Sequence, residues 1–248
     1  MIVHDPRNPV AIRHAELLRA HLGGDELERL SVVIGGDGFM LHSVAKLGLK
    51  RPFVGLNAGR VGFLLNDVAD WAEAARALLQ HDLITWEFPL IRAQVHSPQG
   101  QISAHDAVND VYLERASGQT ARLSLSVDGT EVVNTLVADG VIDSTALGST
   151  AYNFSAGGPP CHPSLKVLSI TPICPHLPRL SAFALPHTAQ IQVDVQHPER
   201  RPVRAVVDGR DAGPVSSVSI GYGPKNLRLA YFTDHDFTAR MMHKILHP

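Results

Sequence analysis

The sequence contains few cysteines and no long apolar run. Among its 248 residues, Cys161 and Cys174 are the only cysteines, too few for a disulfide framework and too far apart for a C-x-x-C redox pair. No stretch reaches the roughly 18 uninterrupted apolar residues that span a bilayer. The first residues lack a basic region followed by an apolar one. The sequence therefore predicts a cytoplasmic protein with reduced thiols and no membrane partner.

An excess of charge of either sign is also missing. The chain has 22 Lys and Arg against 24 Asp and Glu, a formal charge of −2. Nucleic-acid-binding domains usually carry clustered basic residues and a positive net charge, so we expect no nucleic-acid partner. We find no internal repeat and no low-complexity linker. These absences describe an ordinary globular chain that is long enough for one large core or two domains.

The first hundred residues alternate between strand-like and helical segments. Expected strands cover residues 2–3, 30–34 and 52–56, and expected helices cover 11–20, 39–47 and 71–80. Asp70 is a suitable cap for the last of these helices. This β-α-β-α order indicates a parallel sheet covered by helices, which we assign to an N-terminal α/β domain over residues 1–95.

The pattern then changes to short alternating apolar segments separated by turns. Expected strands cover residues 90–95, 108–113, 121–127, 132–137, 191–195, 203–207 and 215–220. Such a series predicts an antiparallel sandwich or a meander-rich sheet. The predicted fold class is therefore α/β plus all-β, with a β-sandwich-like domain over residues 96–232. Residues 233–248 form a tail that we expect to be helical and to pack back on the N-terminal domain.

The strongest local motif is a glycine-rich turn, Gly35-Gly36-Asp37-Gly38, between a buried strand and a helix. Glycines at the carboxyl end of a parallel strand let a phosphate approach the backbone, and the N–H groups of the next helix favour an anion. A carboxylate repels a phosphate, so Asp37 is better suited to accept a proton from a hydroxyl or to help hold a metal. The alternative is a β-turn in which Asp37 caps the helix.

Three further segments are rich in glycine or polar residues. Residues 55–64 contain three glycines that permit close backbone approach, although a simple packing loop is the alternative. Asn109-Asp110 places an amide beside a carboxylate, which suits an adenine edge and a ribose diol, or else forms a turn. Residues 138–160 hold many small hydroxyl residues and glycines, which favours a hydrogen-bonding lining over a polar structural helix. Within this last segment Tyr152 can stack on a base or a pyridine ring.

No dedicated protein metal site is predicted. One possible zinc set comprises Cys161, His162, Cys174 and His176, but the spacings do not match paired-ligand patterns and prolines crowd each position. The sequence also shows no carboxylate cage of the kind that holds a divalent cation.

In order along the chain, these motifs resemble the NAD kinase family. The resemblance includes Gly35–Gly38, Gly55–Leu64, Asn109-Asp110, Asp139-Gly140, Gly148–Tyr152, Ser155–Pro159, Leu168–His176 and Asp208-Gly209. It covers nearly the whole chain, and the ordered set is more specific than the first glycine loop alone.

The resemblance implies a small Rossmann-like N-terminal domain, a β-rich C-terminal domain, and an active site in the cleft between them. It implies transfer of the γ-phosphoryl of ATP, with a divalent cation, to the adenosine 2′-hydroxyl of NAD, giving NADP. Because Mg²⁺ keeps several waters and binds substrate phosphates, we expect this cation to be Mg²⁺ delivered with ATP. Asp37 is then the catalytic base, and Gly35, Gly36 and Gly38 form the phosphate loop. The implied NAD contacts are Asp37, Gly38, His42, Asn109, Asp110, Arg122, Asp139, Thr150, Ala151, Tyr152, Asn153, Phe154 and Ser155.

Three positions depart from the family pattern. Phe39 follows the glycine loop where the family usually has Thr, Ser or Asn, and Asp110 stands where Glu is commoner. Both changes are expected to alter reach or packing rather than chemistry. Ala146-Leu147 replaces a usual Pro-Thr, and Leu147 thereby removes a hydroxyl that could meet the ligand.

Two other functions are compatible with parts of the pattern. A lipid or sugar kinase can share the glycine loop, but it would favour an apolar acceptor pocket over Ser149, Thr150 and Asn153. A non-catalytic NAD- or NADP-binding protein would not need Asp37 in that loop. The family resemblance further suggests a homodimer or homotetramer, and it leaves open whether polyphosphate can replace ATP.

Overall fold

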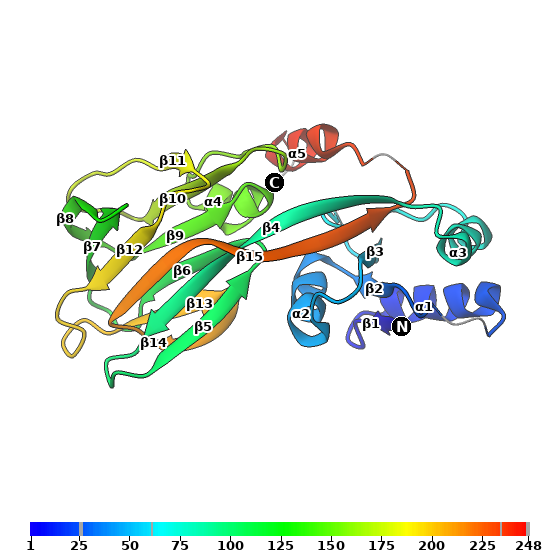
Figure 1. The fold of residues 1–248 in the computed structure, drawn as a ribbon, viewed down its shortest axis with the longest axis horizontal. Helices are drawn as coiled ribbons and strands as arrows, with labels where there is room; N and C mark the ends of the chain where they lie inside the picture. The colour runs from blue at the N-terminus through cyan, green and yellow to red at the C-terminus, as the bar shows by residue number, and fades with distance from the viewer. Residues whose placement is uncertain (25–26, 61, 234, 247–248) are drawn as a thin grey trace. The chain divides into compact units, whose positions relative to one another are not determined.

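The computed structural model describes residues 1–24, 27–60, 62–233 and 235–246, and it divides the chain into two compact units (Figure 1). Unit 1 comprises residues 1–88 and 225–248, and unit 2 comprises residues 89–224. We expected the first boundary at residue 95 and the second at 232. Both boundaries instead fall inside long strands, β4 (Ile84–His96) and β15 (Ser217–Tyr231), which contribute residues to both units. A strand that continues across a boundary gives no sequence signal there.

Unit 1 is built around a parallel sheet. Its elements are β1 (Ile2–His4), α1 (Pro9–Leu22), β2 (Ser31–Gly35), α2 (Asp37–Leu47), β3 (Phe53–Asn57), α3 (Trp71–Gln80) and α5 (Phe237–Leu246). Strand β2 pairs in parallel with β1 and β3, and β3 pairs in parallel with the end of β15. Asn8 and Asp70 cap α1 and α3 through their side chains, as the sequence predicts for Asp70.

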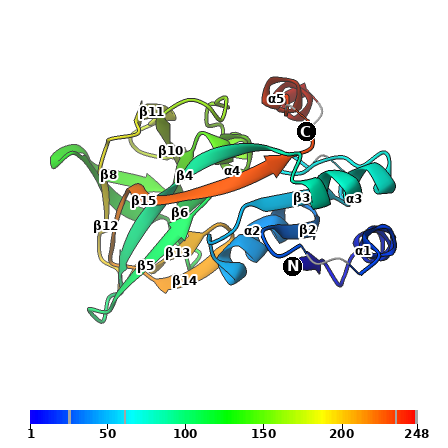
Figure 2. The ribbon, with the colours of Figure 1, turned by 45° about the vertical axis from the view of Figure 1, so that its right-hand side comes forward.

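Helices cover both faces of this sheet. Alternate strand residues such as Val32 and Ile34 pack with Leu18 of α1 and Leu78 of α3, which form one apolar cluster. The opposite face packs against α2, since a side chain added at Gly55 would meet Met40 of that helix. In both ribbon views the strands lie between α2 and the α1–α3 pair (Figures 1 and 2). These observations confirm the predicted Rossmann-like α/β arrangement.

The C-terminal tail is helical over Phe237–Leu246 and packs within unit 1. Phe237 is 1% exposed, and its ring lies 5.9 Å from Phe63 and 5.4 Å from Trp86, measured between centroids. Such tilted and edge-on aromatic pairs stabilise a contact by about 0.5–1.5 kcal/mol beyond area burial. Asp234, His247 and Pro248 of the expected tail lie outside the described residues.

Unit 2 consists of two antiparallel sheets. One sheet has the order β11 (Phe183–Pro186), β10 (Val167–Ile173), β9 (Gly140–Thr145), β6 (Asp110–Arg115), β13 (Val203–Val207) and β14 (Arg210–Pro214). The other contains β8 (Thr130–Ala138), β7 (Ala121–Val127), β12 (Ile191–Val195), β15, β4 and β5 (Ile102–Ala107). The two long strands β4 and β15 run side by side (Figure 2). A single apolar cluster combines inward-facing residues of both sheets, including Leu123 of β7 and Val141 of β9, which confirms a β-rich, sandwich-like unit.

Several strands of unit 2 were not predicted from the sequence. Strand β9 lies inside residues 138–160, which we interpreted as a polar lining because of their serines and threonines. Its residues are all buried, and the hydroxyls of Ser144 and Thr145 bond to backbone groups: Ser144 Oγ donates to the carbonyl of Asn109, and Thr145 Oγ1 donates to that of Val108. Strand β5 has exposed residues at its first half and no clear apolar alternation, so its periodic signal is weak.

In the described part of the chain, no helix is both long and apolar enough to cross a bilayer; the longest, α1, has 14 residues.

Asp143 in β9 is an unusual core residue. It lies opposite Val111 of β6 and Ile170 of β10, is fully buried, and has no hydrogen-bond partner among the described residues for either carboxyl oxygen. Burial raises the pKa of this carboxyl to about 8. The ordinary pKa of this carboxyl is 3.8, so the native state keeps the proton to a higher pH than the unfolded chain does. Linkage then requires that the free energy of unfolding falls as pH rises from about 4 to about 8.

We predict that Asp143→Val raises the free energy of unfolding by about 2 kcal/mol at pH 7. The change removes a buried carboxyl with no hydrogen-bond partner among the described residues and places valine opposite the β-branched Val111 and Ile170. The gain in Tm should be larger at pH 8 than at pH 5, as measured by thermal unfolding followed by circular dichroism. Asp143→Asn is the matched control: it removes the titration but keeps unpaired polar atoms. A lower Tm for Asp143→Val than for the parent at pH 8 would contradict this interpretation.

Candidate active site

The glycine loop 35–38 joins β2 to α2. Gly35 is the last residue of β2, Gly36 is extended with a φ of −103°, and Asp37 is the first residue of α2. A Cβ on Gly35 would lie 2.9 Å from Phe39 Cδ1, so the Phe39 ring occupies the space over this glycine. Phe39, where the sequence departs from the family pattern, thus packs against the glycine loop.

Asp37 does not act as a helix cap. The N-cap position is Gly36, which has no side chain to accept a hydrogen bond. Instead, Asp37 Oδ2 accepts from the backbone N–H of Phe63 at 3.0 Å, and Oδ1 accepts from that of Leu64 at 2.9 Å. The carboxylate therefore joins the glycine loop to the second motif, residues 55–64, and is held in one orientation by two donors.

The loop after β3 is shaped for this contact. Asn57 Oδ1 accepts from the N–H of Gly59 at 2.8 Å, and Asn57 Nδ2 donates to Asp67 Oδ1 at 2.9 Å. Gly62 has a φ of +61°, and a Cβ there would lie 2.6 Å from Asn57 Cγ. Glycine is therefore required at this turn, both for the left-handed backbone and for the close approach to Asn57.

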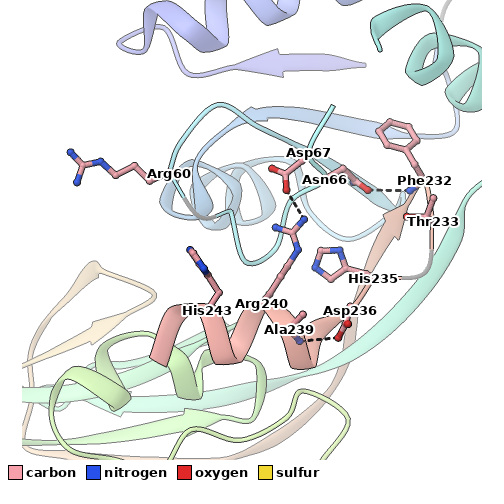
Figure 3. A pocket seen from close by; sticks show the side chains of 10 residues that line it. All are labelled: Arg60, Asn66, Asp67, Phe232, Thr233, His235, Asp236, Ala239, Arg240 and His243. Carbon is pink, nitrogen blue, oxygen red and sulfur yellow. Dashed lines mark hydrogen bonds and ion pairs between the residues drawn. The ribbon is translucent and has the colours of Figure 1, made fainter. Parts of the chain in front are cut away.

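Two cavities lie in unit 1 near these loops. One, of about 840 Å³, is lined by Gly38, Phe39, His42 and Lys46 together with residues 1 and 3–7. His42 is exposed on α2, and its ring stacks on Phe39 with centroids 6.5 Å apart. The second cavity, of about 630 Å³, lies beside α5 (Figure 3). Its lining residues are Arg60, Asn66, Asp67, Phe232, Thr233, His235, Asp236, Ala239, Arg240 and His243.

In unit 2, Asn109 and Asp110 lie at the start of β6 and are positioned by Asp208. The carboxylate of Asp208 accepts backbone N–H groups from Val108 at 2.8 Å, Asn109 at 2.8 Å and Asp110 at 3.3 Å. Asp208 has a φ of +47° in the two-residue turn between β13 and β14. The Asp-Gly turn was visible in the sequence, but its function as an anchor for residues 108–110 was not predicted.

The side chains of Asn109 and Asp110 are electrostatically unusual. Asn109 Oδ1 is buried and has no hydrogen-bond partner in the described part of the chain. Asp110 is 4% exposed, and burial together with the nearby charge of Asp208 raises the pKa of its carboxyl to about 7. Burial also raises the pKa of Asp208, against the opposing effect of its three backbone bonds. A buried acceptor without a donor and a carboxyl near its titration point are typical of a ligand site.

The Asn109-Asp110 motif contacts the segment 138–160 through the backbone of Asn109. Its carbonyl accepts from the N–H of Thr145 at 2.9 Å, and a Cβ on Gly148 would lie 2.4 Å from Asn109 Cα. Thr145 Oγ1 also donates to the carbonyl of Val108 at 2.8 Å and accepts from the N–H of Gly148 at 2.9 Å. Glycine at position 148 is therefore required by the close approach of the Asn109 backbone.

Residues 147–155 form a short 3-10 turn, η1 (Leu147–Thr150), followed by one turn of α4 (Tyr152–Ser155). Among the predicted NAD contacts in this segment, Tyr152 and Ser155 are exposed, Ala151 and Phe154 are partly buried, and Thr150 and Asn153 are buried. The Tyr152 ring packs edge-on against Tyr112, with centroids 5.0 Å apart. Leu147, which is 4% exposed, contributes to packing.

Asn153 has a structural role that was not anticipated. Its Nδ2 donates to the carbonyls of Ser149 at 2.9 Å and Pro159 at 3.2 Å, and its Oδ1 accepts from Thr171 Oγ1 at 2.6 Å. The side chain is fully buried. These bonds use both ends of the amide, so Asn153 holds the loop together rather than facing solvent.

Two of the predicted NAD contacts, Asp139 and Arg122, lie outside the hydrogen-bonded segments 108–110 and 145–159. Asp139 lies between β8 and β9 and forms an ion pair with Arg115, with 2.7 Å between Oδ1 and Nε. Arg122 is exposed on β7, in the sheet of unit 2 that does not contain Asn109 and Asp110. The structure also contains no group of three or more His, Cys, Asp or Glu side chains arranged to hold a metal ion among the residues that it describes.

Curated relatives match this chain over most of its length. The NAD kinase of Cereibacter sphaeroides is 37% identical over 240 residues, which cover 94% of this chain and 93% of the relative. The NAD kinase of Rhizorhabdus wittichii is 39% identical over 232 residues, covering 90% and 89% respectively. Residues 108–225 also match the model of the ATP-NAD kinase C-terminal domain family.

The fold is shared with solved structures. Yeast NADH kinase, crystallised in complex with NADH, matches 99% of this chain and 86% of its own, with a TM-score of 0.86 and 21% identity. An NAD kinase from Archaeoglobus fulgidus in complex with ATP matches 99% and 97%, with a TM-score of 0.79 and 23% identity. On its identity to the curated relatives over nine tenths of its length, the chain belongs to the NAD kinase family.

Proposed function

We propose that this protein is an NAD kinase that transfers the γ-phosphoryl group of ATP to the adenosine 2′-hydroxyl of NAD, giving NADP and ADP. The observation that carries the proposal within the structure is the carboxylate of Asp37, which follows a glycine loop and is oriented by two backbone donors. Family membership supports the same activity. A direct test incubates the purified protein with NAD, ATP and Mg²⁺ and measures NADP, with polyphosphate as a second donor.

Asp37 is the proposed general base. A ribose hydroxyl has a high pKa, so it needs an acceptor for its proton as its oxygen attacks phosphorus. In this step the 2′-oxygen forms a bond to the γ-phosphorus, the bond from that phosphorus to the β–γ bridging oxygen breaks, and the proton moves to Asp37. The donors Phe63 and Leu64 fix the carboxylate before the substrate arrives, which reduces the entropic cost of reaction.

Gly35, Gly36 and Gly38 are proposed to form the phosphate loop. Gly36 and Gly38 leave open space where a side chain would project, so a phosphate can approach the backbone at the N-terminus of α2. The divalent cation, Mg²⁺, is proposed to enter as part of the MgATP substrate, where it neutralises the triphosphate. The absence of a carboxylate cluster among the described residues is compatible with such delivery.

Asn109, Asp110, Tyr152 and His42 are proposed to bind NAD. Asn109 Oδ1, to which no residue in the described part of the chain donates, can accept from the amino group of adenine, and an ionised Asp110 can accept from a ribose diol. Tyr152 and His42 offer exposed rings for stacking. The remaining proposed contacts are Asp37, Gly38, Arg122, Asp139, Thr150, Ala151, Asn153, Phe154 and Ser155; for the buried Asn153 we propose a supporting role through the loop that it holds.

We further propose that the protein functions in the cytoplasm as a homodimer or homotetramer. Light scattering coupled to size-exclusion chromatography measures the subunit number directly, and a monomer at assay concentrations would contradict this part of the proposal.

We predict that Asp37→Asn lowers kcat for NADP formation by about 10²–10⁴-fold, because an amide cannot accept the proton. The exposed Asp82→Asn, which makes the same charge change at the end of α3, should leave kcat within twofold. An Asp37→Asn enzyme that retained most of the parental rate would exclude Asp37 as the base.

We also predict that NAD binds more tightly as pH rises through about 7, since the pKa of Asp110 is raised to about 7 and its ionised form accepts more hydrogen bonds. Asp208→Asn removes the neighbouring charge and should shift this transition to lower pH. Calorimetric titration with NAD at several pH values measures the effect, with Asp110→Asn as the control that flattens the profile. A transition that is unchanged in Asp110→Asn would assign the titration to another group.

A further inference from the structure

The C-terminal helix α5 is fixed against the loop that holds Asp37. Its N-terminal end is anchored by Phe237 in the aromatic cluster and by Asp236 Oδ1, which accepts from the N–H of Ala239 at 2.8 Å. One turn later, Arg240 donates from Nη1 to the carbonyl of Gly62 at 2.8 Å and pairs through Nη2 with Asp67 Oδ2 at 2.8 Å. Figure 3 shows Arg240 between α5 and Asp67. These contacts define where the next turn of the helix lies.

Lys244 is placed on the same side of α5, four residues after Arg240 and seven after Phe237. Its ammonium nitrogen lies 5.4 Å from the centroid of the Phe63 ring. The backbone N–H of that same Phe63 donates to Asp37 Oδ2. Phe63 therefore contacts both groups: its ring contacts the Lys244 ammonium group, and its backbone N–H contacts the carboxylate of Asp37, the proposed base.

The charge of Lys244 is incompletely compensated. Burial lowers the pKa of its ammonium group, and the negative charge of Asp37 partly opposes that shift. Among the residues that the structure describes, Lys244 forms no ion pair, and its ammonium group makes a cation–π contact with the Phe63 ring. Burial of a cation that no described residue neutralises by an ion pair is unfavourable, so the ammonium group can gain from binding a further anion.

We propose that Lys244 binds the phosphates of the phosphoryl donor beside Asp37. This inference rests on the proposed function, and it adds a substrate-binding residue that lies far from the glycine loop in the sequence. A carboxylate base and a polyphosphate repel each other, so a site that brings them together gains from a cation between them. The lysine ammonium is a compact point charge with three donors, which suits phosphate oxygens of varying position.

A purely structural role predicts a different outcome. If Lys244 only packs its stem and charge on Phe63, its loss lowers the free energy of unfolding by about 0.5–2 kcal/mol. Such a loss should change KM for ATP and KM for NAD equally. Lys244→Met keeps a long apolar stem without the charge, and Lys244→Arg keeps the charge. Lys50→Met is the matched control, since Lys50 is exposed and precedes β3, at the opposite strand ends from the glycine loop.

The experiment compares these variants in steady-state kinetics and in calorimetric binding of inorganic tripolyphosphate with Mg²⁺ to the full-length protein. We expect Lys244→Met to raise KM for ATP and Kd for tripolyphosphate roughly tenfold, with KM for NAD within twofold. Lys244→Arg should restore most of both values, and Lys50→Met should match the parent.

Unchanged tripolyphosphate affinity in Lys244→Met, or equal increases in KM for ATP and NAD, would overturn the proposal. The binding measurement also distinguishes failure of the proposed NAD kinase activity from failure of the proposed phosphate contact of Lys244. A parent protein that forms no NADP contradicts the proposed function, whereas tripolyphosphate binding that depends on Lys244 would still support the anion site. If Lys244→Met fails to fold, Lys244→Gln and the arginine variant provide the same comparison.

Discussion

The interaction on which the candidate catalytic centre depends is the pair of hydrogen bonds from Phe63 and Leu64 to the carboxylate of Asp37. It links a glycine loop that ends β2 with a second loop that ends β3, and each loop is constrained in turn. Gly62 permits the turn that presents these donors, and Arg240 of α5 holds the Gly62 carbonyl. A charged acceptor with two backbone donors forms stronger bonds than a neutral one, so this contact orients both motifs at once.

A second carboxylate, Asp208, organises unit 2 in a comparable way. It accepts three consecutive N–H groups of residues 108–110 and thereby fixes the start of β6. The Asn109 carbonyl then receives Thr145, and Gly148 packs against the same backbone. The result is a buried polar network in which Asn109 Oδ1 has no hydrogen-bond partner among the described residues and Asp110 has a raised pKa. Unsatisfied or perturbed groups inside an otherwise satisfied network are a characteristic of binding sites.

Much of the fold could be predicted from local pattern. The α/β order of the first 80 residues was clear because buried parallel strands and amphipathic helices have distinct periodicities, and Asp70 has a recognisable cap signature. Strand β9 could not be predicted, because Ser144 and Thr145 are buried through bonds to the backbone of Val108 and Asn109 rather than through apolar side chains. The domain boundaries were misplaced for a related reason: β4 and β15 continue across them without a turn.

The sequence by itself determined the family resemblance, the two fold classes and the residue types of the site, since these depend on local spacing and on short motifs. Only the tertiary structure decided how those residues are used. Asn153 bonds to Thr171 inside the core, Asp208 accepts the N–H of Asn109, and Lys244 lies over the ring of Phe63. Each of these roles depends on contacts between segments that are distant in the chain. Hydrogen-bond partners and burial are properties of the packed chain, and local sequence carries little information about either.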